Sequence, residues 1–205
     1  MKWIILVAVV CGSCMRQPSL PVDSKYSVTA IRNDSVWFGI SNAFRLIPPG
    51  KQPQSIKEFN IRFETDLNYI GRQFPKGWPP NKITGCIEEC NRSQSIILYN
   101  IPLKKGKYNI GGLDKRRKEG ESRSAYWLIG PSGGAYKRYF YEGRNPGWIR
   151  VTKVDKMTNT VEGNFSISFD EDLKYEERLK NDIPPVAKFT NGLFRAMLKD
   201  VKLKE

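Results

Sequence analysis

A two-residue alternation of apolar and polar side chains is the feature that most constrains the fold of this chain. In the clearest stretch, from Val161 to Phe169, the odd positions are apolar apart from Gly163 and the even positions are polar. Successive side chains of a strand point to opposite faces, so this stretch predicts a strand with one dry and one wet face. No long run shows apolar residues at the helical spacing of 3.6. The pattern therefore predicts an all-β fold.

Short apolar segments of this kind recur along the chain, with turn signals between them. Aromatic residues make up 12% of the sequence, and 17 glycines and 13 prolines are available for turns and loops. We expect an antiparallel β-sandwich of about ten short strands. The predicted strands are 26–32, 35–40, 58–64, 94–100, 107–110, 125–129, 135–141, 148–155, 161–169 and 186–198.

The N-terminal residues are typical of an export signal. One positive charge at Lys2 precedes an apolar run over 3–10, which is too short to span a hydrocarbon core of about 30 Å. The following Gly12-Ser13-Cys14 resembles the lipobox of bacterial lipoprotein precursors, with Cys11 at the usual aliphatic position. The resemblance implies a signal peptide over 1–13 and a cysteine at 14 acylated with chains such as palmitate. A plain cleaved signal and an uncleaved anchor are the alternatives.

That processing divides the chain into three parts. The acylated Cys14 would begin a polar tether over 14–24, and a single domain would occupy 25–205. Cys86 and Cys90 would be the two thiols left in an oxidising compartment, and we predict a disulfide between them, with two reduced thiols as the alternative. Two thiolates without histidine cannot complete a zinc site. We expect no metal and no cofactor.

Several segments resemble small Bacteroidota lipoproteins of unknown function. The segments 147–155, 161–169 and 189–194 are similar to the family's closing pattern of "G-x-I-x-I-T", "G-x-F-S-F" and "I-T-N-G-x-F". Upstream, 95–110 and 27–37 are similar to its "I-x-L-x-I…G-T-Y-x-L" stretch and its opening hairpin. The resemblance implies a fold and an envelope location but no known activity. Because no acidic run follows Cys14, we expect the periplasmic face of the outer membrane.

Two glycines within these segments receive a structural interpretation. Gly163 lies beside bulky Phe165, and Gly192 follows Asn191. We expect both glycines at bulges or turns that need a positive φ.

Charge is the second informative feature. The formal net charge of +13 favours a polyanionic partner or an anionic membrane surface. Envelope partners of this kind are anionic lipid, lipopolysaccharide and acidic glycan; nucleic acid is not expected, since no nucleic-acid motif is present. If 94–100 pairs with 107–110, two basic turns would meet in one rim; the alternative is a solvated surface. The candidate anion-binding residues are Lys104, Lys105, Lys107, Lys115, Arg116, Arg117 and Lys118.

Aromatic residues accompany further cations between Arg123 and Trp148, where they could stack on sugars or simply fill the core.

Catalytic chemistry is restricted because the chain contains no histidine. Ser-His-Asp and Cys-His arrangements are therefore excluded. A carboxylate pair for glycan hydrolysis remains the alternative to a non-catalytic binding or structural module. The acidic run at 170–172 lacks the regular spacing of a calcium loop. Candidate carboxylates are Glu64, Asp66, Glu88, Glu89, Asp170, Glu171 and Asp172.

Overall fold

The computed structural model describes residues 18–65, 94–117, 122–129, 135–141, 144–172 and 184–204. The predicted acylation site Cys14 and the predicted disulfide between Cys86 and Cys90 lie outside these ranges and stay predictions. The described elements are β1 (Val28–Arg32), β2 (Ser35–Ile47), η1 (Pro53–Ser55), β3 (Glu58–Thr65), β4 (Gln94–Pro102), β5 (Gly106–Asn109), α1 (Ile110–Asp114), β6 (Ala125–Ile129), β7 (Ala135–Phe140), β8 (Gly147–Asp155), β9 (Thr160–Glu171) and β10 (Val186–Lys202).

The all-β prediction is confirmed, and each of the ten predicted strands corresponds to an observed one. Strands β2 and β10 extend furthest beyond their predicted ends, where residues 42–47 of β2 pair in parallel with residues 197–202 of β10. The predicted strand 107–110 ends one residue earlier, because Ile110 begins the short helix α1.

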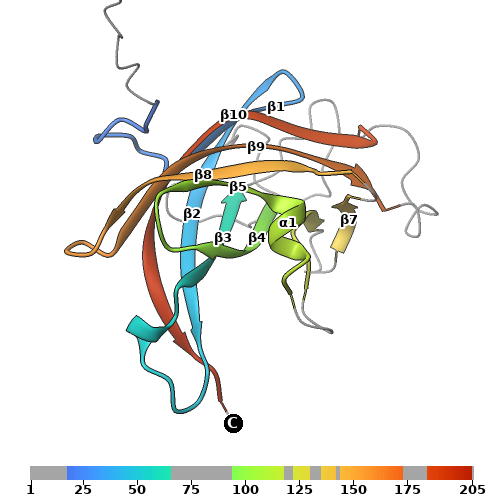
Figure 1. The fold of residues 1–205 in the computed structure, drawn as a ribbon. Helices are drawn as coiled ribbons and strands as arrows, with labels where there is room; N and C mark the ends of the chain where they lie inside the picture. The colour runs from blue at the N-terminus through green and yellow to red at the C-terminus, as the bar shows by residue number, and fades with distance from the viewer. Residues whose placement is uncertain are drawn as a thin grey trace, which may run out of the picture.

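All ten strands belong to one mixed sheet in the order β1-β10-β2-β3-β4-β6-β7-β9-β8-β5 (Figure 1). Strand β10 pairs with β9 as well as with β2, so the pairings from β2 through β9 return to β10 and form a closed ring. An arrangement of two separate sheets is therefore not confirmed. The apolar–polar alternation is common to sandwiches and closed sheets, and the pairing of β9 with β10 is what distinguishes them.

The core fills the inside of this ring. The rings of Phe63 on β3 and Phe165 on β9 stack with centroids 4.7 Å apart, although their strands are not neighbours in the sheet. Tyr126 on β6 meets Phe189 on β10 edge to face at 5.1 Å. These contacts across the interior leave the opposite face of β3, β4, β6 and β7 turned outward.

The positive-φ interpretation of Gly163 and Gly192 is wrong, because neither residue is among those with positive φ. Both glycines are instead required by close packing. A Cβ at Gly163 would collide with the carbonyl oxygen of Arg150 and the ring of Phe194, and a Cβ at Gly192 would meet the ring of Phe165. The missing side chain makes room for an aromatic ring on the neighbouring strand.

The condition for a single basic rim, a pairing of 94–100 with 107–110, is not met. Strand β5 pairs antiparallel with β8, while β4 pairs with β3 and β6. The turn between β4 and β5 therefore leads the chain from one part of the sheet to another instead of forming a hairpin.

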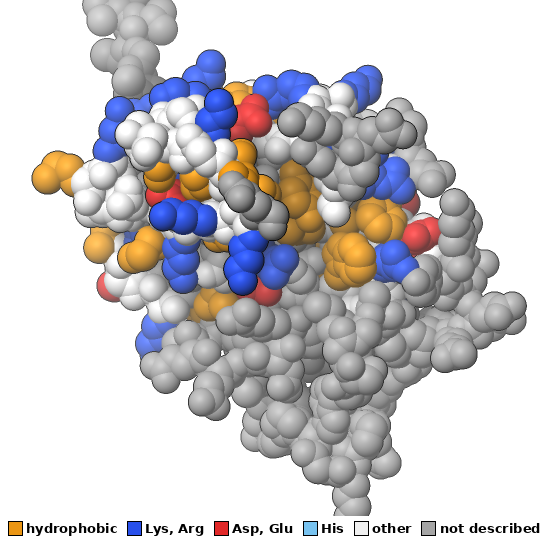
Figure 2. Space-filling view, turned by 90° about the horizontal axis from the view of Figure 1, so that it is seen from below, with side chains coloured by type: hydrophobic (Ala, Val, Ile, Leu, Met, Phe, Trp, Pro, Cys, Tyr) orange, Lys and Arg blue, Asp and Glu red, His pale blue; other side chains and the backbone are white. Residues whose placement is uncertain are grey.

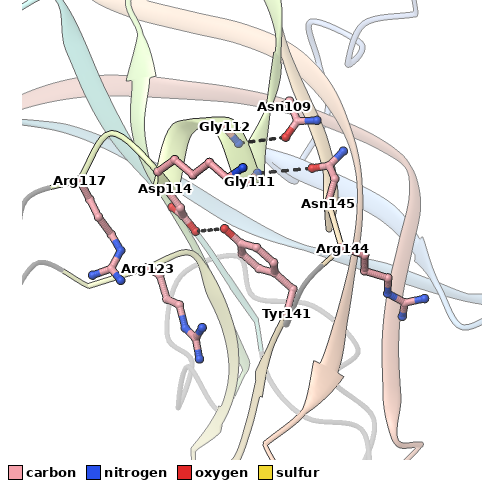
Figure 3. Close-up of a pocket in the computed structure, with 10 residues that line it drawn as sticks. Asn109, Gly111, Gly112, Asp114, Arg117, Arg123, Tyr141, Arg144 and Asn145 are labelled. Carbon is pink, nitrogen blue, oxygen red and sulfur yellow. Dashed lines mark hydrogen bonds between the residues drawn. The ribbon is translucent and has the colours of Figure 1, made fainter.

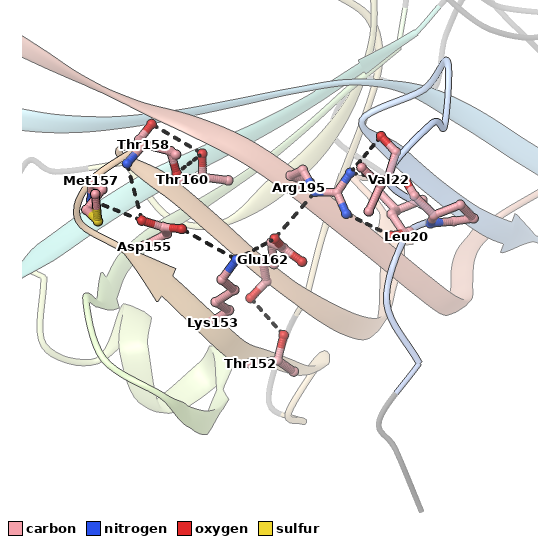
Figure 4. A network of polar contacts seen from close by, with 11 residues as sticks. Leu20, Val22, Thr152, Lys153, Asp155, Met157, Thr158, Thr160, Glu162 and Arg195 are labelled. Carbon is pink, nitrogen blue, oxygen red and sulfur yellow. Dashed lines mark hydrogen bonds and ion pairs between the residues drawn. The ribbon is translucent and has the colours of Figure 1, made fainter.

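The described end of the predicted tether is attached to the sheet. Leu20 is 4% exposed. The guanidinium of Arg195 on β10 donates to the carbonyl oxygens of Leu20, Pro21 and Val22 (Figure 4). Residues 20–22 are thus part of the folded unit. In the described part of the chain, the helical segments lack the length and apolar content to cross a membrane.

Candidate functional site: a basic cleft beside helix α1

On the face that Figure 2 shows, basic side chains are spread over the described part, with fewer acidic ones between them. Net charge alone therefore does not locate a binding site. A concave place where several cations meet is a stronger indication, because low-dielectric walls focus the electrostatic field there.

The predicted basic run after α1 divides between two places. Lys115 and Arg117 line a cleft beside the helix. Arg116 turns away from the cleft, with its Nη1 3.3 Å from Glu58 Oε1 on β3. Lys118 lies outside the described residues.

The other predicted cluster lies elsewhere. Lys104 and Lys105 are exposed in the turn before β5. The Lys107 ammonium lies over the ring of Trp148, 4.3 Å from its centroid. None of these three lysines lines the cleft.

Four cations line the cleft, which has a volume of about 820 Å³, within the range of pockets that hold small ligands. Lys115 and Arg117 follow α1, Arg123 precedes β6, and Arg144 lies between β7 and β8. Figure 3 shows Arg117 and Arg123 on one side of Tyr141 and Arg144 on the other. The side chains come from three loops at one edge of the sheet.

Asp114 is the single carboxylate among the described residues of this lining. Its side chain is 5% exposed and accepts hydrogen bonds of 2.9 Å from Ser124 N, Ser124 Oγ and the Tyr141 hydroxyl. These bonds join the end of α1 to the segments before β6 and after β7. The carboxylate therefore acts as a structural junction beneath the cations.

Tyr141 remains a phenol over the physiological pH range. Burial raises its pKa, and the hydrogen bond and negative charge of Asp114 raise it further. The Tyr141 hydroxyl is therefore a fixed donor to Asp114 (Figure 3).

Two amide side chains complete the polar lining. Asn109 caps α1 by accepting a 3.0 Å hydrogen bond from Gly112 N, and Asn145 Oδ1 accepts from Gly111 N and Gly147 N. Because these backbone donors require the oxygens, each amide nitrogen points elsewhere (Figure 3). Neither nitrogen donates to a residue in the described ranges. Both are available to a ligand.

The cations of the cleft outnumber its acids. Four cations and one carboxylate give a formal charge of +3 for the described lining. Arg144 forms an exposed ion pair with Asp170, which contributes at most about 1 kcal/mol in this setting. Arg123 lies over the ring of Phe140, 4.7 Å from its centroid, and has no carboxylate within ion-pair distance among the described residues. The cleft is thus arranged to receive an anion.

The candidate carboxylates do not gather at this site. Glu64 on β3 accepts a hydrogen bond from Asn42 Nδ2 at 3.1 Å and lies near Arg62, while Glu171 pairs with Lys137 at 2.6 Å. Asp66, Glu88 and Glu89 lie outside the described residues, and Asp172 does not line the cleft. Across the described ranges, no three Cys, Asp or Glu side chains are grouped so that they could hold a metal ion.

The predicted basic run supplies half of the cations in the cleft, Lys115 and Arg117. Arg123 and Arg144 come from the stretch in which further cations accompany aromatic residues, for which the sequence leaves both ligand binding and core packing open. Strands β6 and β7 are antiparallel, so the start of β6 and the end of β7 meet at one edge. Their positions on either side of a predicted hairpin are therefore the signal that would have placed both residues in one site.

Comparisons with protein families, curated proteins and solved structures found no match. The function therefore has to be inferred from the geometry of the cleft itself.

Proposed function

We propose that this protein is a lipid-anchored envelope lipoprotein that binds an acidic glycan in the basic cleft without catalysing a reaction. The observation that carries the proposal is the surplus of cations around one carboxylate that is already engaged by Ser124 and Tyr141. An acidic ligand would neutralise the surplus, and its carboxylates would form charge-assisted hydrogen bonds with the arginines.

The shape and the neutral donors of the cleft favour a glycan over a membrane surface. Arginines bind carboxylates in any setting, but the amide nitrogens of Asn109 and Asn145 add directional donors that suit ring and hydroxyl oxygens. A concave site of about 820 Å³ can surround a sugar unit, whereas a flat bilayer would favour a protruding basic patch. Anionic lipid and lipopolysaccharide are thus the competing ligands to be tested.

A binding role suits the carboxylates better than hydrolysis does. Glycosidases of the usual kind need one carboxylic acid and a second carboxylate about 5 to 10 Å away across the scissile bond. The described lining of the cleft holds only Asp114, whose two oxygens both accept hydrogen bonds that join the loops.

The test compares two variants that lose the same charge. Lys115→Gln/Arg123→Gln removes two cations from the cleft, and Lys104→Gln/Lys105→Gln removes two from the exposed turn outside it. The full-length protein in neutral detergent is titrated with polygalacturonate, with its methyl ester, and with vesicles containing anionic lipid or lipopolysaccharide. Each charged hydrogen bond that is lost contributes about 1.5 to 3 kcal/mol to the free energy of binding. We therefore expect the cleft variant to lose at least about a hundredfold in affinity for polygalacturonate.

The turn variant should bind polygalacturonate within about threefold of the wild type, and high salt should weaken binding by all proteins. Equal losses in both variants would mean that bulk charge is responsible. Preferential binding to vesicles would favour a membrane ligand, and shortening of the polymer would reveal an enzyme. Each of these three results contradicts the proposal.

The lipid anchor rests on Gly12-Ser13-Cys14. Metabolic labelling with an alkyne fatty acid should mark the wild type and not Cys14→Ala, which should leave the membrane fraction. Equal labelling of both proteins would contradict the anchor.

A further inference from the structure

A second hollow adjoins the basic cleft. It has a volume of about 570 Å³, and Arg117 and Arg123 contribute to the lining of both hollows. Both arginines lie on the same side of Tyr141 (Figure 3). Because the two hollows share these side chains, a ligand longer than one sugar unit can extend from one hollow into the other.

The floor of the second hollow is the outer face of the sheet. Arg62 on β3 pairs with Ile97 on β4, and both residues line the hollow. Their chain neighbours Phe63 and Ile96 have the opposite parity and belong to the core. Arg62 is therefore held by a paired strand, which fixes its backbone position better than a loop would.

Cations outnumber acids in this hollow as they do in the cleft. Its described lining holds three arginines, Arg62, Arg117 and Arg123, and a single carboxylate, Glu64, which gives a formal charge of +2. Arg62 does not line the basic cleft. It is thus the cation that the second hollow adds to the site.

The buried carboxylate of Glu64 does not cancel this surplus. Its side chain is 6% exposed and accepts a hydrogen bond of 3.1 Å from Asn42 Nδ2. The Arg62 side chain is 45% exposed, and its Nη1 lies 3.8 Å from Glu64 Oε1, which is beyond hydrogen-bond distance. Arg62 therefore offsets the charge of Glu64 and can still donate to an anion in the hollow.

An aromatic wall stands beside these cations. Trp127 lines the hollow together with Phe140, and the two rings meet edge to face with centroids 6.1 Å apart. The guanidinium of Arg138 lies 5.2 Å from the centroid of the Trp127 ring. An aromatic wall next to arginines suits a sugar acid, whose ring has an apolar face and whose carboxylate is anionic.

We propose that the two hollows form adjoining subsites for two consecutive acidic units of one glycan. The first carboxylate binds among Lys115, Arg123 and Arg144 in the cleft, and the second binds at Arg62. This inference rests on the proposed function and deepens it, because it specifies a glycan with a run of acidic sugars and names Arg62 as the residue that recognises the second acid.

Three small probes test the inference with the full-length protein in neutral detergent. They are galacturonate, digalacturonate, and digalacturonate with one of its two carboxylates methyl-esterified, each titrated by calorimetry or ligand-observed NMR. The wild type should bind digalacturonate about tenfold or more tighter than galacturonate, because the second acid adds a charge-assisted hydrogen bond. The monoester should bind at least about fivefold more weakly than digalacturonate, because an ester carries no charge.

Two variants that lose the same charge locate the second acid. Arg62→Gln should weaken binding of digalacturonate about tenfold, change galacturonate binding by no more than about twofold, and bring the two disaccharides to about equal affinity. Lys51→Gln is the matched control, because Lys51 is exposed and lines neither hollow. It should bind all three probes within about twofold of the wild type.

The inference is overturned if digalacturonate binds no tighter than its monoester. It is also overturned if Arg62→Gln weakens galacturonate as much as digalacturonate, or if Lys51→Gln weakens digalacturonate as much as Arg62→Gln does. Failure of the proposed function gives a different result, in which polygalacturonate itself does not bind, or binds equally to the cleft variant and the wild type.

Discussion

Two charged regions of this protein use the same residue types for opposite purposes. In the network on β8, β9 and β10, Arg195 and Lys153 share Glu162, and Arg195 also donates to three backbone carbonyls (Figure 4). In the basic cleft, four cations surround one carboxylate whose hydrogen-bond donors are neutral. Cations that share an acid and backbone acceptors within the fold indicate stability, and cations that gather on a concave surface around a single carboxylate indicate binding.

The largest expected effect concerns Asp114, the structural charge within the binding region. Asp114→Ala leaves Ser124 N, Ser124 Oγ and the Tyr141 hydroxyl without their acceptor in a buried place. We expect a loss of about 3 kcal/mol in the free energy of unfolding, measured by urea denaturation. Asp200→Ala removes an exposed partner of Arg45 and should cost no more than about 1 kcal/mol. Equal effects of the two variants would contradict the role of Asp114 as a junction.

The next effect concerns Arg195. Arg195→Met keeps most of the apolar stem but removes the contacts with Glu162 and with residues 20–22. We expect a loss of about 2 kcal/mol in stability and faster proteolysis near residue 20, with no change in glycan binding. Lys199→Met, at an exposed position of the same strand, is the matched control. Weaker glycan binding by Arg195→Met would remove the distinction between the two regions.

These two regions also show what sequence reasoning can and cannot supply. Period-two alternation placed all ten strands, because the face that a side chain meets depends only on its own strand. The closure of the sheet depends on β9 pairing with β10, and the parallel pairing of β2 with β10 joins segments far apart in sequence. Neither pairing can be recognised from a local pattern in the sequence.

The candidate site divides in the same way. A local basic run pointed to Lys115 and Arg117, but the same run misassigned Arg116, which turns toward Glu58. Arg123 and Arg144 join the cleft only because β6 and β7 return the chain to one edge. Side-chain direction within a short loop and contacts between separate loops are tertiary properties, which residue type alone does not encode.

A smaller effect is expected at alkaline pH from Tyr141. Burial is the main cause that raises the pKa of the Tyr141 phenol, and the hydrogen bond and negative charge of Asp114 raise it further. A group with a raised folded pKa stabilises the fold below its unfolded pKa of about 10, and this contribution is lost as pH rises through the folded pKa. Tyr141→Phe should therefore be less stable by about 1 kcal/mol near pH 8. Its deficit relative to the wild type should shrink above about pH 10.

Urea denaturation of both proteins across this alkaline range measures the difference. A deficit that stays constant through the titration of tyrosine would contradict the coupling of Tyr141 to Asp114.

The most direct test of the central claim is to locate bound glycan by hydrogen–deuterium exchange of the full-length protein with and without polygalacturonate. We predict protection in peptides that cover 109–117, 122–129 and 135–145, which include the residues that line the basic cleft. The exposed turn at Lys104 and Lys105 and the network around Arg195 should exchange at unchanged rates. Protection centred on that turn or on β10, or protection spread evenly over the basic surface, would contradict the assignment of binding to the cleft.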